Sequence, residues 1–201
     1  MAAEARGGFG ARDLLLVSLI CLAWAGNFLA SKLALLELPP LLFTALRLGL
    51  LAVLLAAFLK RPSREQWPRL IAVALCNGVL HFGLSFWSLK LSKNIASPAI
   101  VMQSYVPMAT LLAWWLLGER FHWRTGAAIA LSFLGVLVLG FDPVVLASPA
   151  ALALMLVSAF FLGLGTVFLR GLKGMSAVNQ QGWAAMIGVG PLLLWSLLVE
   201  P

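Results

Sequence analysis

The sequence predicts an all-α, polytopic bundle of transmembrane helices, and three observations support this fold class. Of the 201 residues, 62% are hydrophobic and 10% are charged, and the mean hydropathy is +1.01. A soluble domain of this length cannot bury so many apolar side chains in its core. The apolar residues also form continuous runs near the ~20 residues that a spanning helix needs, whereas a membrane β-barrel shows short alternating segments.

Seven apolar runs are each predicted to form one transmembrane helix, because each lies between charged residues or between breaks marked by Pro or Gly. In chain order the runs are residues 14–31, 40–59, 69–89, 96–117, 125–141, 149–169 and 177–198. The first run is longer than the ~7–15 apolar residues at the centre of a secretory signal. Because further spans follow it, we expect it to be a retained helix.

Lys and Arg are distributed unevenly between the two sets of alternate loops. One set contains only Lys32, Lys90 and Lys93. The other contains Arg6, Arg12, Lys60, Arg61, Arg64, Arg69, Arg120, Arg124, Arg170 and Lys173. Because positively charged loops stay on the cytoplasmic side, we predict a multi-pass protein of the inner (plasma) membrane with a cytoplasmic N-terminus. The net charge of +7 then reflects topology, and no nucleic-acid partner is expected.

A weak internal repeat emerges when the first predicted helix is aligned with the sixth, which matches Gly26 with Gly165. Five helices separate the starts of the two copies, so the second copy would be inverted in the membrane, as in many transporters. Residues 1–144 are therefore predicted to form a first five-helix repeat. Residues 145–201 are predicted to form the first two helices of a second, inverted repeat.

Four unusual side chains lie at a similar depth in the predicted helices. At 1.5 Å per residue, Trp24, Arg47 and Gln103 are each about 10 Å below the outer end of their helix, and His81 is about 12 Å below. A guanidinium inside an apolar run such as that around Arg47 costs ~2.5–3.5 kcal/mol on insertion scales. If these side chains face one another, they line a polar cavity that opens outward. Alternatively, Arg47 snorkels toward the outer headgroups or bonds helix carbonyls.

Two local patterns support a polar interior. Asn77, His81 and Ser85 are four residues apart and would share one face of an α-helix. Pro107 lacks the amide that would bond the carbonyl of Gln103, so a kink is expected there, with that carbonyl and the Gln103 amide side chain both available. His81 fits either a hydrogen-bonded contact between helices or a proton carrier.

All seven acidic residues fall in loops or at helix ends. No embedded carboxylate is therefore available to hold a lipophilic cation, and the available charges are those of Arg47, Lys32 and Lys90. A carboxylate-bearing or zwitterionic substrate suits such a cavity better than a cationic drug, with Trp24 as an apolar or cation-binding wall. No metal site and no cofactor is predicted.

Two long stretches resemble the EamA-type branch of the drug/metabolite transporter superfamily. They are WAGNFLASKLALLELPPLLFTALRLGLLAVLL, from Trp24 to Leu55, and SPAIVMQSYVPMATLLAWWLLGERFHWRTGAAIALSFLGVLVL, from Ser97 to Leu139. The resemblance implies ten helices in two inverted five-helix repeats around a central path for small metabolites, and within this branch it is nearest to exporters of amino acids and related metabolites. The chain departs from the pattern in having seven predicted helices, and in having Gly163 near a position where a tryptophan is often found.

These arguments together define the candidate substrate-binding residues. They are Trp24, Asn27, Arg47, Asn77, His81, Gln103 and Pro107. We expect an exporter of small metabolites, most of all amino acids or related carboxylate-bearing compounds, that works by alternating access. A multidrug or other solute efflux protein, and a membrane protein that does not transport, remain as alternatives.

A membrane enzyme is a further alternative, but no G-x-S-x-G or H-E-x-x-H motif and no embedded Asp pair is present. Ser85 with His81 lacks an orienting carboxylate, so we do not expect an enzyme. The expected partners are a small-molecule substrate and the lipid bilayer. We expect the chain to be a fragment of a longer protein, and the rival hypothesis is a natural seven-helix protein that closes its cavity as a homodimer.

The charge bias makes a topological prediction. A cytoplasm-specific reporter fused after Lys60 or Arg124 should be active, and a reporter that works only outside should be active when it is fused near Asp142. The measurement is reporter activity in intact cells. The opposite pattern would contradict both the orientation and the inverted repeat.

Overall fold

The computed structural model describes residues 10–139 and 148–200 and is all-helical over those residues. In chain order the helices are α1 (Ala11–Glu37), α2 (Pro40–Leu55), η1 (Ala56–Phe58), α3 (Trp67–Val73), η2 (Ala74–His81), α4 (Phe82–Leu91), α5 (Ala96–Met102), α6 (Tyr105–Leu117), α7 (Trp123–Leu139), α9 (Pro149–Leu169) and α10 (Ala177–Val199). The segments η1 and η2 are a 3₁₀ and a π-helix, respectively. The predicted fold class, a polytopic helical bundle, is confirmed.

Six helical rods in the described residues are long and apolar enough to cross a membrane. They are Ala11–Glu37, Pro40–Phe58, Trp67–Leu91, Ala96–Leu117, Pro149–Leu169 and Ala177–Val199. The remaining predicted span corresponds to α7, which has 17 described residues. The predicted boundary between the repeats at residues 144 and 145, and Asp142, lie outside the described residues.

The first helix is longer than the apolar run 14–31 that predicts it. Lys32 does not end α1, because its Nζ donates hydrogen bonds to the carbonyls of Leu89 and Ser92, both at 2.6 Å. In return, Lys90 Nζ donates to the Leu38 carbonyl at 3.1 Å. The C-terminal ends of α1 and α4 therefore cap each other, and both ammonium groups are used in that contact.

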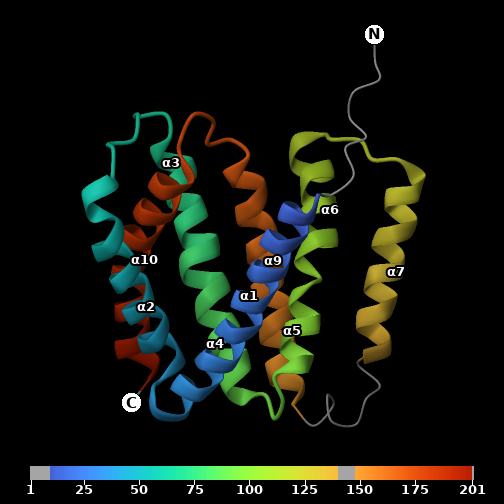
Figure 1. The fold of residues 1–201 in the computed structure, drawn as a ribbon, viewed down its shortest axis with the longest axis horizontal. Helices are drawn as coiled ribbons and strands as arrows, with labels where there is room; N and C mark the ends of the chain where they lie inside the picture. Colours follow the sequence, from blue (N-terminus) through green and yellow to red (C-terminus); the bar gives the residue numbers. More distant parts are fainter. Residues whose placement is uncertain (1–9, 140–147, 201) are drawn as a thin grey trace.

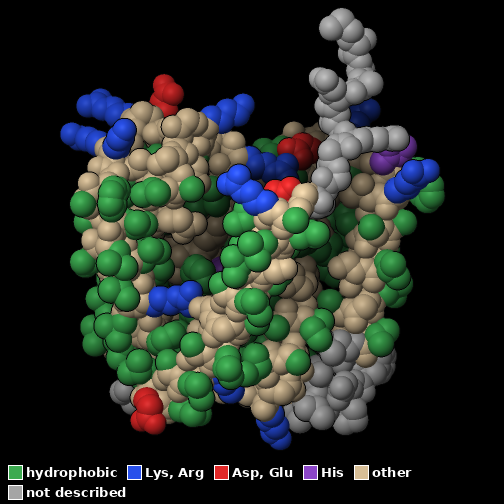
Figure 2. Space-filling view, in the orientation of Figure 1, with side chains coloured by type: hydrophobic (Ala, Val, Ile, Leu, Met, Phe, Trp, Pro, Cys, Tyr) green, Lys and Arg blue, Asp and Glu red, His purple; other side chains and the backbone are tan. Residues whose placement is uncertain are grey.

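Figure 1 shows α9 near the centre of the bundle, α2 beside α10 at one side, and α7 at the opposite edge. α9 packs against α4, η2, α5 and α6. α1 crosses the front of the bundle and is buried only near its C-terminal end, at Ser31 and Leu35. The loops that join α2 to α3, α6 to α7 and α9 to α10 lie at one end, where Figure 2 shows many of the Lys and Arg side chains.

α2 and α10 form the most extensive helix pair. Leu41 and Leu48 on α2 pack with Leu192 on α10 in one buried cluster. The Glu200 carboxylate, just beyond α10, accepts hydrogen bonds from the amides of Leu41 at 2.7 Å and Leu42 at 3.0 Å. The first amides of a helix have no partner within that helix. Glu200 therefore caps α2 from α10 and fixes the two helices in register.

The helix predicted over residues 96–117 is interrupted at Gln103 and Ser104, between α5 and α6. Pro107 accounts for the break, because it has no amide to continue the helical ladder. The expectation that the Gln103 carbonyl is free is wrong. This carbonyl accepts a hydrogen bond from the amide of Val106 at 3.2 Å. A tighter turn, with a hydrogen bond between residues three apart, replaces the missing helical bond.

Two glycines of α9 allow close approach of neighbouring helices. A Cβ on Gly163 would lie 3.1 Å from the Ala109 amide nitrogen and 3.3 Å from the Tyr105 carbonyl oxygen, both of α6. A Cβ on Gly165 would overlap the Asn77 side chain of η2. Small residues at such contacts let helix backbones approach within the membrane.

Gly165→Ala should therefore lower the free energy of unfolding by ~1–3 kcal/mol, the usual cost of overpacking. Combining it with Asn77→Ala should restore most of the loss, because the overlapping amide is removed. Thermal unfolding in detergent, followed by circular dichroism, measures both effects. The control is Gly26→Ala, since a Cβ on Gly26, which the sequence alignment matches with Gly165, meets nothing within 4 Å. Equal behaviour of the two alanine variants would contradict the packing.

Candidate functional site

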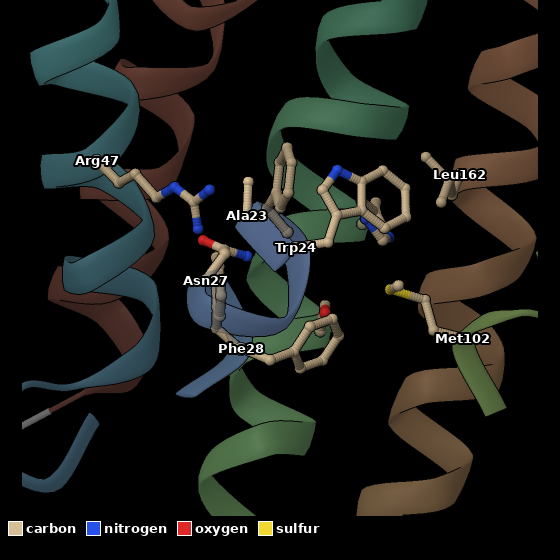
Figure 3. Close-up of a pocket in the computed structure, with 11 residues that line it drawn as sticks. Ala23, Trp24, Asn27, Phe28, Arg47, Met102 and Leu162 are labelled. Atoms are coloured by element: carbon tan, nitrogen blue, oxygen red, sulfur yellow. The ribbon is translucent and has the colours of Figure 1, made fainter. Parts of the chain in front are cut away.

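A cavity of about 310 Å³ lies between α1 and the helices behind it. Figure 2 shows the molecule hollowed on this face, and Figure 3 shows the lining side chains. They are Ala23, Trp24, Asn27, Phe28, Arg47, His81, Phe82, Ser85, Phe86, Met102 and Leu162. The volume is at the lower end of the ~300–1,000 Å³ typical of small-molecule sites.

α1 contributes one wall through Trp24, Asn27 and Phe28. Their spacing of three and four residues places them on one helical face, and Figure 3 shows them between α2 and α9. The Trp24 side chain is 53% exposed in this chain. Trp24 and Asn27 are thus brought together with Arg47, as the sequence predicts.

Arg47 extends from α2 into the space between two hollows. Its Cζ lies 5.2 Å from the ring centroid of Phe86 and 5.6 Å from that of Phe82, which are cation–π distances. It lines the main cavity and a neighbouring apolar hollow of about 350 Å³. Figure 3 shows its guanidinium directed toward Asn27 on α1. The charge is therefore held among aromatic faces at the cavity.

His81 is buried and serves a contact between helices. Its Nδ1 lies 2.8 Å from Ser158 Oγ and 3.2 Å from the Ser158 carbonyl, while Ser158 Oγ donates to the His81 carbonyl at 2.8 Å. Because that hydroxyl donates its hydrogen to the carbonyl, it accepts from Nδ1–H in this arrangement. Nε2 is then the ring nitrogen that this contact does not use.

Asn77 does not line the main cavity. Its Oδ1 is buried without a hydrogen-bond partner among the described residues, beside a small hollow of about 30 Å³ that Gln180 and Gln181 also line. A hollow of that size has room for a water molecule. The three residues predicted to share one helical face therefore separate: His81 and Ser85 line the main cavity, and Asn77 lines the small hollow. The physical reason is η2, because the wider π-turn rotates Asn77 away from its α-helical position.

Gln103 and Pro107 also lie outside the cavity. Gln103 is exposed and Pro107 is buried against neighbouring helices, and neither belongs to the lining. The turn at Gln103 and Ser104 redirects the chain, so that Met102 lines the cavity in its place. The expected layer of four side chains therefore holds for three of them.

Sequence reasoning missed the apolar part of the lining. Phe82, Phe86, Met102 and Leu162 are ordinary members of apolar runs, and their hydrophobicity does not distinguish them from lipid-facing neighbours. The only available signal is the position of Phe82 and Phe86, one and five residues after His81. Lys32 and Lys90, expected as available charges, instead bind the carbonyls at the helix ends.

The cavity is polarised, in the sense that one side carries a positive charge and the opposite side is apolar. None of its eleven lining residues is acidic, and Arg47 is the one lining residue that is always charged. Figure 3 shows Arg47 on one side, with Met102 and Leu162 on the opposite side. Such a site can hold an anionic group at the guanidinium and an apolar group against the far wall.

Comparisons with known proteins address the family of the chain. A sequence model of the EamA-like transporter family matches residues 12–141, a range that contains every lining residue of the cavity except Leu162. No solved structure matches the chain.

Several curated proteins are similar to this chain. A protein of Escherichia coli (strain K12) described as a probable amino-acid metabolite efflux pump is 28% identical over 195 residues. A protein of Salmonella typhimurium (strain LT2) with the same description is 29% identical over 196 residues. Both alignments cover 94% of this chain and 65% of the relative, so the chain spans about two thirds of their length. The uncharacterized transporter YvbV of Bacillus subtilis (strain 168) is 34% identical over 167 residues, or 79% of this chain and 54% of that protein.

The contact between His81 and Ser158 can be tested by mutation. Ser158→Ala removes a hydroxyl that both accepts from and donates to His81, so the free energy of unfolding should fall by ~1 kcal/mol, as for hydrogen bonds between membrane helices. Ser132→Ala, on the exposed side of α7, is the matched control and should change little. Denaturant titration in micelles measures the difference. A Ser158→Ala variant as stable as the control would show that this pair does not hold the helices.

Proposed function

The chain belongs to the EamA-like transporter family, and on that premise we propose that the protein exports small metabolites by alternating access. The proposed substrates are amino acids and related carboxylate-bearing compounds, in particular those with an apolar side chain. The descriptions of the Escherichia coli and Salmonella relatives as probable amino-acid metabolite efflux pumps support this substrate class. The long apolar helices support a multi-pass membrane location.

The polarised cavity is the observation that carries the proposal. A substrate carboxylate would bind the Arg47 guanidinium, whose planar fork matches two carboxylate oxygens. An apolar side chain would then lie toward Met102 and Leu162. The substrate amine would lie near the Asn27 amide and the face of Trp24, which are suitable partners for an ammonium group.

The same lining disfavours the other functions. A cationic drug would face Arg47 with no carboxylate in the lining to balance its charge. For an enzyme, a nucleophilic Ser85 would need His81 as an oriented base. The Nδ1 of His81 is instead engaged by Ser158, and no hydrogen bond joins Ser85 to His81 in the described part of the chain.

We further propose that the N-terminus is cytoplasmic and that the membrane is the inner (plasma) membrane. The excess of Lys and Arg in one set of alternate loops supports this orientation. On this orientation, the Arg47 layer is nearer the outer face, and the loops that join α2 to α3 and α9 to α10 are cytoplasmic.

The substrate class can be tested with the protein in proteoliposomes. Uptake of radiolabelled leucine should be inhibited by unlabelled leucine. It should not be inhibited by leucinamide, which keeps the side chain and amine but lacks the carboxylate. Equal inhibition by both compounds would contradict recognition of the carboxylate.

The role of Arg47 can be tested in the same assay. Arg47→Lys keeps the charge but loses the fork geometry, so transport should fall about tenfold, the equivalent of one lost charge-assisted hydrogen bond. Arg47→Leu should lower it further. Membrane abundance should be unchanged in both, as measured by immunoblotting. Arg124→Lys, whose side chain stacks on Trp123 away from the cavity, is the control. Full transport by Arg47→Leu would exclude the proposed role.

A further inference from the structure

A second polar hollow lies at the end of the bundle that contains most Lys and Arg side chains. It is separate from the cavity around Arg47. Its volume is about 370 Å³, and it lies between the loop that precedes α3 and the loop that precedes α10. It is lined by Phe58, Lys60, Arg61, Pro62, Gln66, Gly174, Met175, Ser176, Val178 and Asn179. Figure 2 shows Lys and Arg side chains gathered over this end of α2, α3 and α10.

Hydrogen bonds fix the walls of this hollow. The Lys60 amide donates to Asn179 Oδ1 at 2.6 Å, and the Trp183 indole nitrogen donates to the Lys60 carbonyl at 3.0 Å. Gln66 Nε2 donates to the Lys173 carbonyl at 3.3 Å. The two loops are therefore joined to each other and to α10. The hollow is a built feature of the fold, and the Lys60 side chain takes no part in building it.

The hollow is strongly electropositive. Lys60 and Arg61 both line it, and none of its ten lining residues is acidic. Within the described residues the one ion pair joins Arg170 to Glu119, away from the hollow. Lys60 and Arg61 therefore have no carboxylate partner there. Two uncompensated cations at a concave surface attract an anion.

Apolar side chains also lie at the hollow. Trp67 and Trp183 make an edge-to-face contact, with their ring centroids 5.1 Å apart, and tryptophans of this kind are typical of the headgroup region. Phe58 and Val178 line the hollow and are 66% and 42% exposed. A ligand here meets cations on one side and exposed apolar side chains on the other.

We propose that this hollow binds the headgroup of an anionic phospholipid. The phosphodiester would lie between Lys60 and Arg61, and the first carbons of the acyl chains would lie against Phe58 and Val178. Basic pockets between helices on the cytoplasmic side suit anionic headgroups. The site shares no residue with the cavity around Arg47, so this proposal does not depend on the proposed transport function. A free phosphate would share the ionic contacts but not the apolar ones.

The test measures binding to the purified protein in non-ionic micelles, by native mass spectrometry and by the thermal shift. The probes are phosphatidylglycerol, phosphatidylcholine and glycerol phosphate. Phosphatidylglycerol should bind more tightly than either of the others. In the variant Lys60→Gln/Arg61→Gln its affinity should fall about 30-fold, the combined effect of two basic residues near an anionic lipid.

Three further variants make the test specific. Arg120→Gln/Arg124→Gln removes the same charge from the same end, outside the hollow, and should keep the affinity. Lys60→Arg/Arg61→Lys should also keep it, because both positive charges remain. Phe58→Ser should weaken phosphatidylglycerol binding and leave glycerol phosphate binding unchanged.

The proposal is overturned if the Lys60→Gln/Arg61→Gln variant binds phosphatidylglycerol like the unaltered protein. It is equally overturned if the Arg120→Gln/Arg124→Gln control loses as much affinity, because the attraction would then be a property of the whole face. Glycerol phosphate binding as tightly as phosphatidylglycerol would identify a site for a free phosphate instead of a lipid.

Discussion

The contact between His81 and Ser158 is the constraint on which the interior of this bundle depends. Lipid tails offer no hydrogen-bond partners, so polar side chains within the membrane must satisfy one another. His81 and Ser158 do so reciprocally, with ring nitrogen, hydroxyl and carbonyl all engaged. The contact joins α9, the central helix, to the point where η2 becomes α4. It thereby sets where Phe82, Ser85 and Phe86 enter the cavity.

Arg47 shows how a charge is accommodated within such a bundle. Its guanidinium lies over the rings of Phe82 and Phe86, whose π faces partly replace the water that a cation loses on burial. The helix that carries it is fixed by α10, through the apolar contact around Leu48 and through the Glu200 cap. The position of the charge therefore depends on a helix from the predicted second repeat.

The two helices that the predicted internal repeat aligns differ in their surroundings. The alignment that matches Gly26 with Gly165 also places Trp24 opposite Gly163. On α1 this position carries the indole that lines the cavity. On α9 it has no room for a side chain, because the backbone of α6 is 3.1 Å from a built Cβ. Of the two aligned positions, Trp24 contributes to the cavity lining and Gly163 allows a close contact between helices.

The sequence by itself determined the all-helical membrane class, the seven helical segments, and that Trp24, Arg47 and His81 lie at a similar level along their helices. These follow from composition, run length and rise per residue, which are local properties. The tertiary structure alone decided which residues meet. Asn77 leaves the expected face because η2 is a π-helix, Gln103 turns away at the break before α6, and Lys32 is used by the end of α4. Each outcome depends on which hydrogen-bond partners the backbone groups have in neighbouring turns and helices. Hydrophobic periodicity does not identify those partners.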